Sequence, residues 1–184
     1  MLRFLDMVLA GVGLTVAMPL MALLYVVGLL DTGAPLFRQT RVGRFQKPFT
    51  LVKFRTMRPD TQSIATHLAN PFAVTPLGAF LRRTKLDELP QLWNVLKGEM
   101  SLVGPRPCLF NQTELIEERA SRGVFAARPG ITGLAQINGI DMSTPRLLAE
   151  TDAQMLKGLC MATYFTYIIK TVTGAGRGDR IRQE

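Results

Sequence analysis

Apolar residues occupy almost every position from Met7 to Leu30, and this run is the longest hydrophobic pattern in the chain. Asp6 and Asp31 bracket it, and no polar stripe recurs within it at helical spacing. A straight helix over these residues would reach about 36 Å, enough to cross the hydrocarbon core of a bilayer. A helix that is apolar on all sides is typical of membrane segments, so the pattern predicts a membrane element.

Pro19 lies near the middle of this run. Its ring removes one backbone hydrogen bond and pushes aside the carbonyl group of Thr15, so the helix should kink or break there. A kinked helix that spans the bilayer and a broken helix that enters and leaves by the same face fit this proline equally well. The residues alone leave both alternatives open.

Shorter patterns downstream predict a small domain of helices and short strands. Alternating apolar and polar positions indicate a strand over Phe49–Phe54, and a second strand is expected over Leu134–Ile137 after a glycine-rich turn. The stretch Thr61–Thr75 is polar and is expected to be a surface loop with a short helix. Four helices are predicted. The first begins at Thr75-Pro76, and the second begins at Pro90 and ends at Gly98. The third runs from Thr144-Pro145 to Lys157, and the fourth covers Leu159–Val172.

The last of these helices carries apolar residues at helical spacing with two tyrosines nearby. Packing against the core and lying in the membrane interface both account for Phe165, Ile168, Ile169 and Val172.

Charge narrows the choice of partners. The chain has a net charge of +8 and a pI of about 10.1, which favours polyanions such as nucleic acid, anionic lipid or phosphorylated substrates. A cationic cluster directly after the apolar run would attract anionic headgroups and puts the main domain on the cytoplasmic side. Its members are Arg38, Arg41, Arg44 and Lys47. Cys108 and Cys160 are expected to be unpaired thiols, and His67 a surface residue.

Two adjacent carboxylates, Asp87 and Glu88, lie where a helix should begin, whether that helix starts at Thr84 or at Pro90. Three cations, Arg82, Arg83 and Lys85, lie just upstream. First-turn acids often do no more than complement the helix dipole. Here the surrounding cations would hold the acids ionised. An ionised carboxylate can attack phosphorus or bind Mg²⁺ through oxygen, so this pair is the candidate catalytic site.

Two further segments present cations suited to phosphate. Lys53 and Arg55 would share one face of a strand, where Arg offers a bidentate fork and Lys a point charge. Arg106 stands between Pro105 and Pro107, which fix the backbone around it. A solvated basic edge strand and a structural turn explain these two segments about equally well.

Taken together, these segments resemble the small monotopic bacterial phosphoglycosyl transferases. The resemblance runs in order across most of the chain, which would make it the minimal catalytic unit. It lies in Leu5-Asp6, Gly33 to Gly43, Lys53-Phe54-Arg55-Thr56-Met57, Thr75-Pro76-Leu77-Gly78, Leu81 to Thr84, Leu86 to Leu92, Asn94 to Pro107, and Arg128 to Gln136.

The resemblance implies an α+β, mainly helical fold. Residues 1–34 would form a re-entrant membrane helix broken at Pro19. Residues 35–184 would form a catalytic domain with short strands and interfacial amphipathic helices. The protein would lie in the bacterial inner membrane as a monotopic enzyme with its active site at the cytoplasmic face.

The resemblance also implies a reaction. Such enzymes transfer a sugar-1-phosphate from a UDP-sugar to undecaprenyl phosphate and release UMP. Asp87 would be the nucleophile with Mg²⁺ beside it, and Glu88 would assist. The residues contacting the phosphates or nucleotide would be Lys53, Arg55, Arg82, Lys85 and Arg106. Membrane lipid is an expected partner and nucleic acid is not, and the sequence leaves a homo-oligomer open.

Two positions depart from the family pattern. Met18-Pro19 replaces the Ser-Pro found at the break in many relatives, and Ile140-Asp141 replaces Arg-Asn after Gly139. The second change indicates a different sugar preference, and the segment from Asp141 to Arg180 resembles the subset that acts on modified, often N-acetylated sugars. The competing interpretations are a non-enzymatic membrane-anchored binder and a glycosyltransferase that releases UDP.

Overall fold

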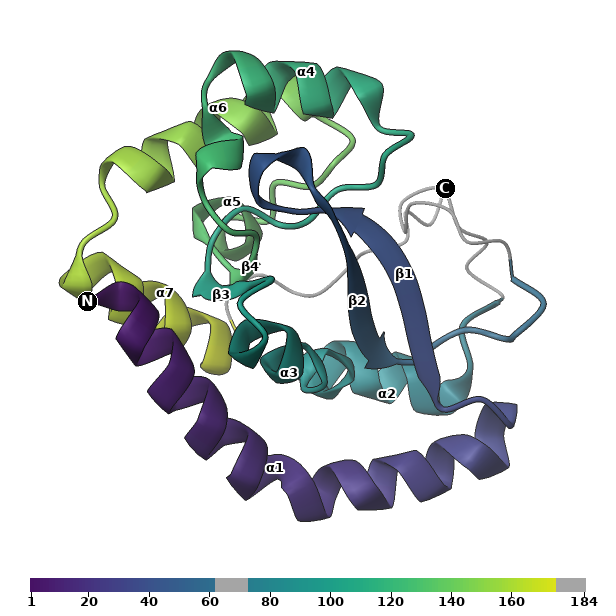
Figure 1. Cartoon of the computed structure of the whole chain (residues 1–184). Helices are drawn as coiled ribbons and strands as arrows, with labels where there is room; N and C mark the ends of the chain where they lie inside the picture. Colours follow the sequence, from purple (N-terminus) through teal and green to yellow (C-terminus); the bar gives the residue numbers. More distant parts are fainter. Residues whose placement is uncertain (62–72, 175–184) are drawn as a thin grey trace.

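The computed structural model describes residues 1–61 and 73–174, and most of these residues are helical. The long helix α1 runs along one side of a compact body that the remaining elements form (Figure 1). The helices are α1 Leu2–Thr32, α2 Pro76–Thr84, α3 Gln91–Leu96, α4 Thr113–Ser121, α5 Leu134–Ile137, α6 Pro145–Lys157 and α7 Met161–Val172. Short 3₁₀ turns are η1 Arg44–Gln46, η4 Leu86–Glu88 and η5 Val124–Ala126, and the strands are β1 Leu36–Val42, β2 Pro48–Phe54, β3 Ser101–Val103 and β4 Gly130–Thr132.

The predicted apolar helix is confirmed as α1, which is long and apolar enough to cross a membrane by length and composition. Pro19 lies inside a helix that continues on both sides of it, so the proline does not end the helix. Figure 1 shows α1 bent near its middle, as expected where a ring displaces a backbone carbonyl. The Thr15 hydroxyl donates to the Gly11 carbonyl oxygen at 2.9 Å.

Both ends of α1 are tied to the same body through carboxylates. Asp6 is 3% exposed and accepts hydrogen bonds from the Ser101 hydroxyl at 2.9 Å and the Tyr164 hydroxyl at 2.8 Å. The Leu102 backbone N–H also donates to Asp6, at 2.9 Å. At the other end, the Thr75 hydroxyl donates to Asp31 at 2.7 Å.

The strands form two small sheets. β1 and β2 pair antiparallel as a hairpin, in which Phe37 lies opposite Lys53 and Arg38 opposite Val52. β3 and β4 pair parallel. Gly104, which follows β3, lies against Gly130 at the start of β4. A Cβ on Gly130 would lie 2.0 Å from the Gly104 nitrogen, so this close backbone approach requires glycine.

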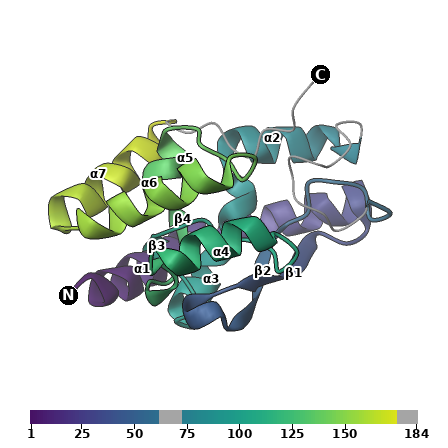
Figure 2. The ribbon, with the colours of Figure 1, turned by 90° about the horizontal axis from the view of Figure 1, so that it is seen from above.

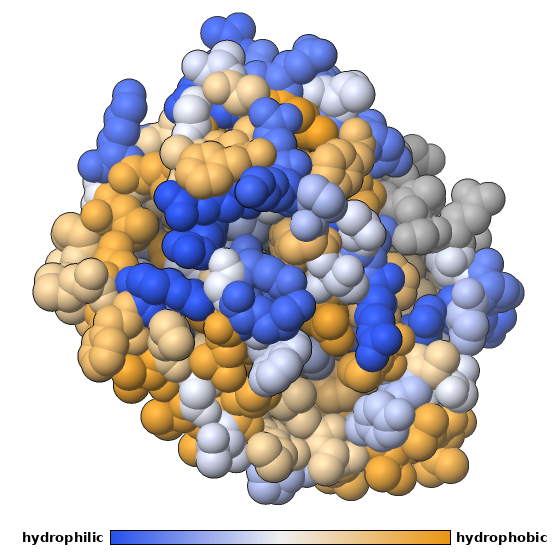
Figure 3. All heavy atoms as spheres, in the orientation of Figure 1, coloured by the Kyte–Doolittle hydropathy of each residue, from blue (hydrophilic) through white to orange (hydrophobic). Residues whose placement is uncertain are grey.

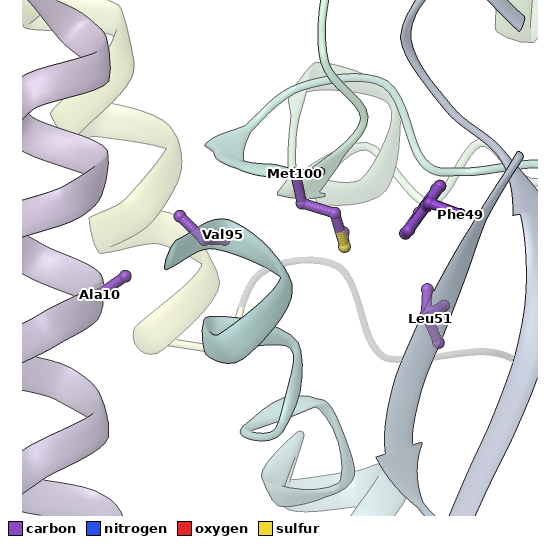
Figure 4. Close-up of a cluster of buried hydrophobic side chains, with 5 residues drawn as sticks. All are labelled: Ala10, Phe49, Leu51, Val95 and Met100. Atoms are coloured by element: carbon purple, nitrogen blue, oxygen red, sulfur yellow. The ribbon is translucent and has the colours of Figure 1, made fainter. Parts of the chain in front are cut away.

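The helix α3 lies between α1 and the hairpin and carries one part of the core (Figure 4). Ala10 of α1 and Val95 of α3 are fully buried. Phe49 and Leu51 extend this cluster from β2, and Met100 completes it. Farther from α1, helices α4 and α6 pack against each other, as the view from above also shows (Figure 2).

Most of the predicted elements are confirmed. The strand expected over Phe49–Phe54 is β2, and the helices expected at Thr75-Pro76, after Pro90, and from Pro145 to Lys157 are α2, α3 and α6. The Thr75 side chain caps α2 by accepting from the Gly78 N–H at 2.9 Å. The loop expected after Thr61 and the single histidine lie largely outside the described residues.

Two expectations need correction. The segment Leu134–Ile137 is the short helix α5, and the strand is instead Gly130–Thr132, which pairs with β3. A four-residue apolar run cannot be assigned to helix or strand by its periodicity, which explains the error. The cationic cluster is not wholly superficial either, because Arg41 is 9% exposed and donates to the Pro107 carbonyl at 3.1 Å.

Helix α7 packs one face against the core, whereas its location in a membrane interface stays a prediction. Tyr164 and Tyr167 are buried against the core. Ile169 and Val172 are 58% and 82% exposed, so the opposite side of the helix presents apolar residues outward.

Candidate active site

The acidic pair lies on the 3₁₀ turn η4, between α2 and α3. Helix α2 ends at Thr84 because Lys85 adopts the left-handed conformation, with φ of 58°. Pro90 then caps α3, so the two acids occupy the tight connection between the helices. A helix beginning at Thr84, one of the two starts considered for this pair, is therefore wrong. Asp87 is 7% exposed and the side chain of Glu88 is 16% exposed.

Arg106 faces this pair from the loop after β3. Its guanidinium lies 3.4 Å from the Glu88 carboxylate, with both side chains partly buried. This contact joins two segments that the sequence separates by 18 residues. A guanidinium at this position stabilises the ionised form of the two carboxylates and would also attract the negative charge of an incoming phosphate.

A buried ion pair between α4 and α6 contacts the backbone of the Arg106 loop. The Arg119 guanidinium of α4 donates to the Arg106 carbonyl oxygen at 2.8 Å. Asp152 of α6 accepts from two nitrogens of Arg119, at 2.6 and 3.0 Å, and both side chains are essentially buried. The hydrogen bonds therefore run continuously from α6 through α4 to Arg106 and on to Glu88.

Lys85 also belongs to this cluster. Burial lowers the pKa of its ammonium from the usual 10.5, the neighbouring Glu88 opposes that change, and Arg106 adds to it. The ammonium also donates to the Thr171 carbonyl of α7 at 3.5 Å. Lys85 thereby connects the acidic pair to the last turn of that helix.

A small polar pocket lies next to Arg106, the residue that contacts Glu88 of η4. Lys53 and Arg106 line it together with Arg41 and Gln91. Three cationic residues around one pocket provide the environment that phosphate groups require. On the face drawn in Figure 3, hydrophilic residues cover the middle, whereas apolar residues gather along the edge where α1 runs.

The predicted binding residues therefore divide into two groups. Lys53, Lys85 and Arg106 surround the acids or the adjoining pocket. Arg55 and Lys53 both lie over the Phe37 ring, but the Arg55 guanidinium also donates to the Ala34 carbonyl at 2.8 Å. Arg82 donates to the Thr56 hydroxyl at 2.9 Å. The roles of all five residues in substrate binding stay predictions.

Within the part of the chain that the structure describes, the candidate site offers only the two carboxylates of Asp87 and Glu88 as acidic ligands for a metal ion. No group of three or more His, Cys, Asp or Glu side chains comes together among residues 1–61 and 73–174. Asp87 and Glu88 nevertheless offer the oxygen ligands that Mg²⁺ takes. This fits an ion held by one or two carboxylates that completes its shell with substrate phosphates and water.

Sequence reasoning missed three contributors to the site. Arg41 was assigned to the membrane surface, although its alternation with Gln39 along a strand was a signal that both share an inner face. Arg119 and Asp152 gave no such signal, because they lie 33 residues apart on separate helices.

Comparison with known sequences identifies the family. The sequence model described as bacterial sugar transferase matches residues 1–177, and the chain belongs to this family, as its motifs predicted. It is 49% identical to the sugar transferase EpsL of Bacillus subtilis, over 60% of this chain and 54% of that protein. It is 40% identical to the UDP-glucose:undecaprenyl-phosphate glucose-1-phosphate transferase of Caulobacter vibrioides, over 82% of this chain and 61% of the relative.

A third relative is the undecaprenyl-phosphate galactose phosphotransferase of Salmonella typhimurium, with 38% identity over 74% of this chain and 32% of the relative. The chain therefore spans about a third to three fifths of the length of these curated relatives.

Proposed function

We propose that the protein transfers a sugar-1-phosphate from a UDP-sugar to undecaprenyl phosphate and so initiates glycoconjugate or polysaccharide synthesis. The observation that carries the proposal is the buried Asp87 beside Glu88, on a turn faced by Lys85 and Arg106. The relatives from Caulobacter vibrioides and Salmonella typhimurium are both transferases that use undecaprenyl phosphate, and the first takes UDP-glucose as its donor. A modified, often N-acetylated sugar is the proposed cargo.

The proposed chemistry proceeds in two displacements. The Asp87 carboxylate attacks the sugar-bearing phosphorus, the bond to the UMP oxygen breaks, and UMP leaves with that electron pair. A phosphate oxygen of undecaprenyl phosphate then attacks the same phosphorus and frees Asp87. Glu88 orients or deprotonates the incoming group, and Lys53 and Arg106 balance the phosphate charge. Bound Mg²⁺ would supply further charge neutralisation at the phosphates.

Asp87→Asn tests this mechanism directly. Detergent-solubilised protein would be incubated with undecaprenyl phosphate, Mg²⁺ and each member of a panel of UDP-sugars, and the released nucleotide identified. We expect UMP from the wild-type protein, and its loss with Asp87→Asn or a chelator. The exposed carboxylate variant Asp60→Asn serves as the matched control and should retain activity.

The identity of the nucleotide discriminates between mechanisms. UDP in place of UMP would mean that the sugar–phosphate bond breaks, which excludes a phosphosugar intermediate on Asp87. An Asp87→Asn protein that released UMP at the wild-type rate would exclude this carboxylate as the nucleophile. No nucleotide from any donor would favour a non-enzymatic membrane binder.

We also propose that α1 enters and leaves the membrane by the same face, with the body of the protein at the cytoplasmic surface of the inner membrane. A straight 31-residue helix would be about 46 Å long, more than the roughly 30 Å of a hydrocarbon core. The support for a re-entrant path is that Asp6 and Asp31, near opposite ends of α1, both bond to the same body. A spanning helix would leave these two carboxylates on opposite sides of the membrane.

Cysteine accessibility tests the topology. In a Cys160→Ser background, which removes the exposed native thiol, Phe4→Cys and Thr32→Cys would be treated with an impermeant maleimide. A re-entrant helix predicts that both are protected in intact spheroplasts and labelled in inverted vesicles. Labelling of one position from each side would establish a spanning helix.

A further inference from the structure

An apolar groove of about 820 Å³ lies between the second half of α1, the β1–β2 hairpin and α3. Met21, Tyr25 and Val26 line it from α1, Val52 from β2 and Trp93 from α3. Its volume lies within the range of about 300–1,000 Å³ that is typical of small-molecule sites. One wall is the apolar helix α1, so hydrocarbon chains would reach the groove directly from the bilayer in the orientation proposed above.

The hairpin separates this groove from the candidate active site. Val52 and the opposing Arg38 line the groove, whereas the next pair along the strands is Lys53 with Phe37. Successive side chains of a strand point to opposite faces, and Lys53 lines the polar pocket with Arg106. A molecule in the groove therefore lies on the opposite face of the hairpin from the polar pocket and from Arg106, so it is not placed to react at Asp87.

The polar groups around the groove indicate what its occupant carries. The Asn94 amide donates to the Thr50 carbonyl and to Glu99, both at 2.7 Å, and the Lys97 ammonium is paired with Glu99 at 2.6 Å. Arg38 is exposed, and its guanidinium makes no hydrogen bond or ion pair within residues 1–61 and 73–174. An available guanidinium beside an apolar groove matches a phosphate attached to hydrocarbon.

We propose that this groove binds an anionic phospholipid of the bilayer as a non-reacting ligand. Its acyl chain would lie between α1 and the hairpin, and its phosphate would contact Arg38. The net negative charge distinguishes such a lipid from a zwitterionic one, whose headgroup carries a compensating cation. The inference rests on the membrane location proposed for α1, but not on the chemistry of Asp87.

Trp93 makes the binding measurable, because it is the single tryptophan of the chain, lines the groove and is 54% exposed. Protein in uncharged detergent micelles would be titrated with phosphatidylglycerol brominated on its acyl chains, and separately with brominated phosphatidylcholine. We expect saturable quenching of Trp93 fluorescence at low mole fraction of phosphatidylglycerol. Phosphatidylcholine should require a higher mole fraction, by about fivefold for one lost headgroup charge contact.

Two variants test the two halves of the proposed site. Arg38→Gln should weaken phosphatidylglycerol binding by about fivefold, to the level of phosphatidylcholine. Ala22→Phe would fill the groove, since Ala22 lines it, and should reduce quenching by both lipids. The matched control is Leu23→Phe, a change at the adjacent position of α1, 59% exposed and outside the groove lining. Equal quenching in the Ala22 and Leu23 variants would overturn the proposal.

Two further outcomes would also overturn it. Quenching by the two lipids that is equal and proportional to mole fraction would mean simple partitioning into the micelle. Displacement of brominated phosphatidylglycerol by equimolar unlabelled undecaprenyl phosphate would assign the groove to the acceptor. Asp87→Asn should bind the brominated lipid like the wild type, so loss of transferase activity and loss of this site are separately measurable.

Discussion

The buried pair of Arg119 and Asp152 gives a prediction whose size follows from the structure. Their side chains are 2% and 0% exposed, and Asp152 accepts two hydrogen bonds from the guanidinium. Removing one partner of a buried ion pair leaves the other charge uncompensated and costs about 3–5 kcal/mol. In a chain of this size that loss corresponds to a decrease in Tm of about 6–20 °C. We therefore expect Asp152→Asn to melt well below the wild-type protein.

A double variant separates stability from activity. Replacing both partners, as in Arg119→Met with Asp152→Leu, leaves no buried charge and should restore most of the lost stability. It does not restore the hydrogen bond that Arg119 donates to the Arg106 carbonyl. A hydrogen bond from a charged donor contributes about 1.5–3 kcal/mol, so kcat/KM should remain about ten- to hundredfold below the wild type.

Thermal unfolding in detergent and UMP release would be measured on the same preparations. Glu117→Gln, which neutralises an exposed carboxylate of α4, is the control and should change neither quantity. A Tm for Asp152→Asn within about 2 °C of the wild type would refute the argument from buried charge. A stable double variant with full activity would show that Arg119 does not position Arg106.

Three other substitutions, one of them with a matched control, have defined outcomes. Burial lowers the pKa of Lys85 below 10.5, so its ammonium loses its charge at a lower pH in the folded protein than in the unfolded chain. The cost of burying the charged ammonium therefore lowers stability at low pH and disappears as pH rises through the pKa of the folded state. Lys85→Arg should therefore move the alkaline limb of a kcat/KM profile to higher pH. Gly78→Ala should cost about 1–3 kcal/mol in denaturant unfolding, because its Cβ would lie 2.0 Å from the Thr56 carbonyl oxygen. Gly158→Ala, with its nearest neighbour at 3.7 Å, should be close to neutral. Asp6→Asn should cost about 1–3 kcal/mol by thermal unfolding, since an amide cannot accept every hydrogen bond that the carboxylate does.

The elements that the sequence predicted best are those with strong local signals. Helix α1 follows from an apolar run, and α2 follows from a capping threonine with proline behind it. The sheet of β3 and β4 could not be predicted in this way. Each strand has only three residues, and their pairing depends on Gly104 and Gly130 meeting across a long sequence separation.

The same distinction holds for the candidate site. Asp87 and Glu88 were recognisable because cations surround them within a few residues of sequence. Arg41, Arg119 and Asp152 were not, because a charged residue on a helix or strand usually faces solvent. Their burial becomes apparent only when partners from distant segments are brought together by the fold.

The hydrogen bonds of Asp6 have a consequence for the order of assembly. This carboxylate lies at the start of the chain, yet the Tyr164 hydroxyl that it binds is 158 residues away. Ser101 and Leu102 are also made long after α1. During synthesis the first helix is therefore produced early, but Asp6 receives its full set of hydrogen bonds only after Tyr164 of α7 has been made. Nascent chains that stop before Ser101 should hold the beginning of α1 loosely, and the last of these hydrogen bonds can form only after Tyr164 has been made.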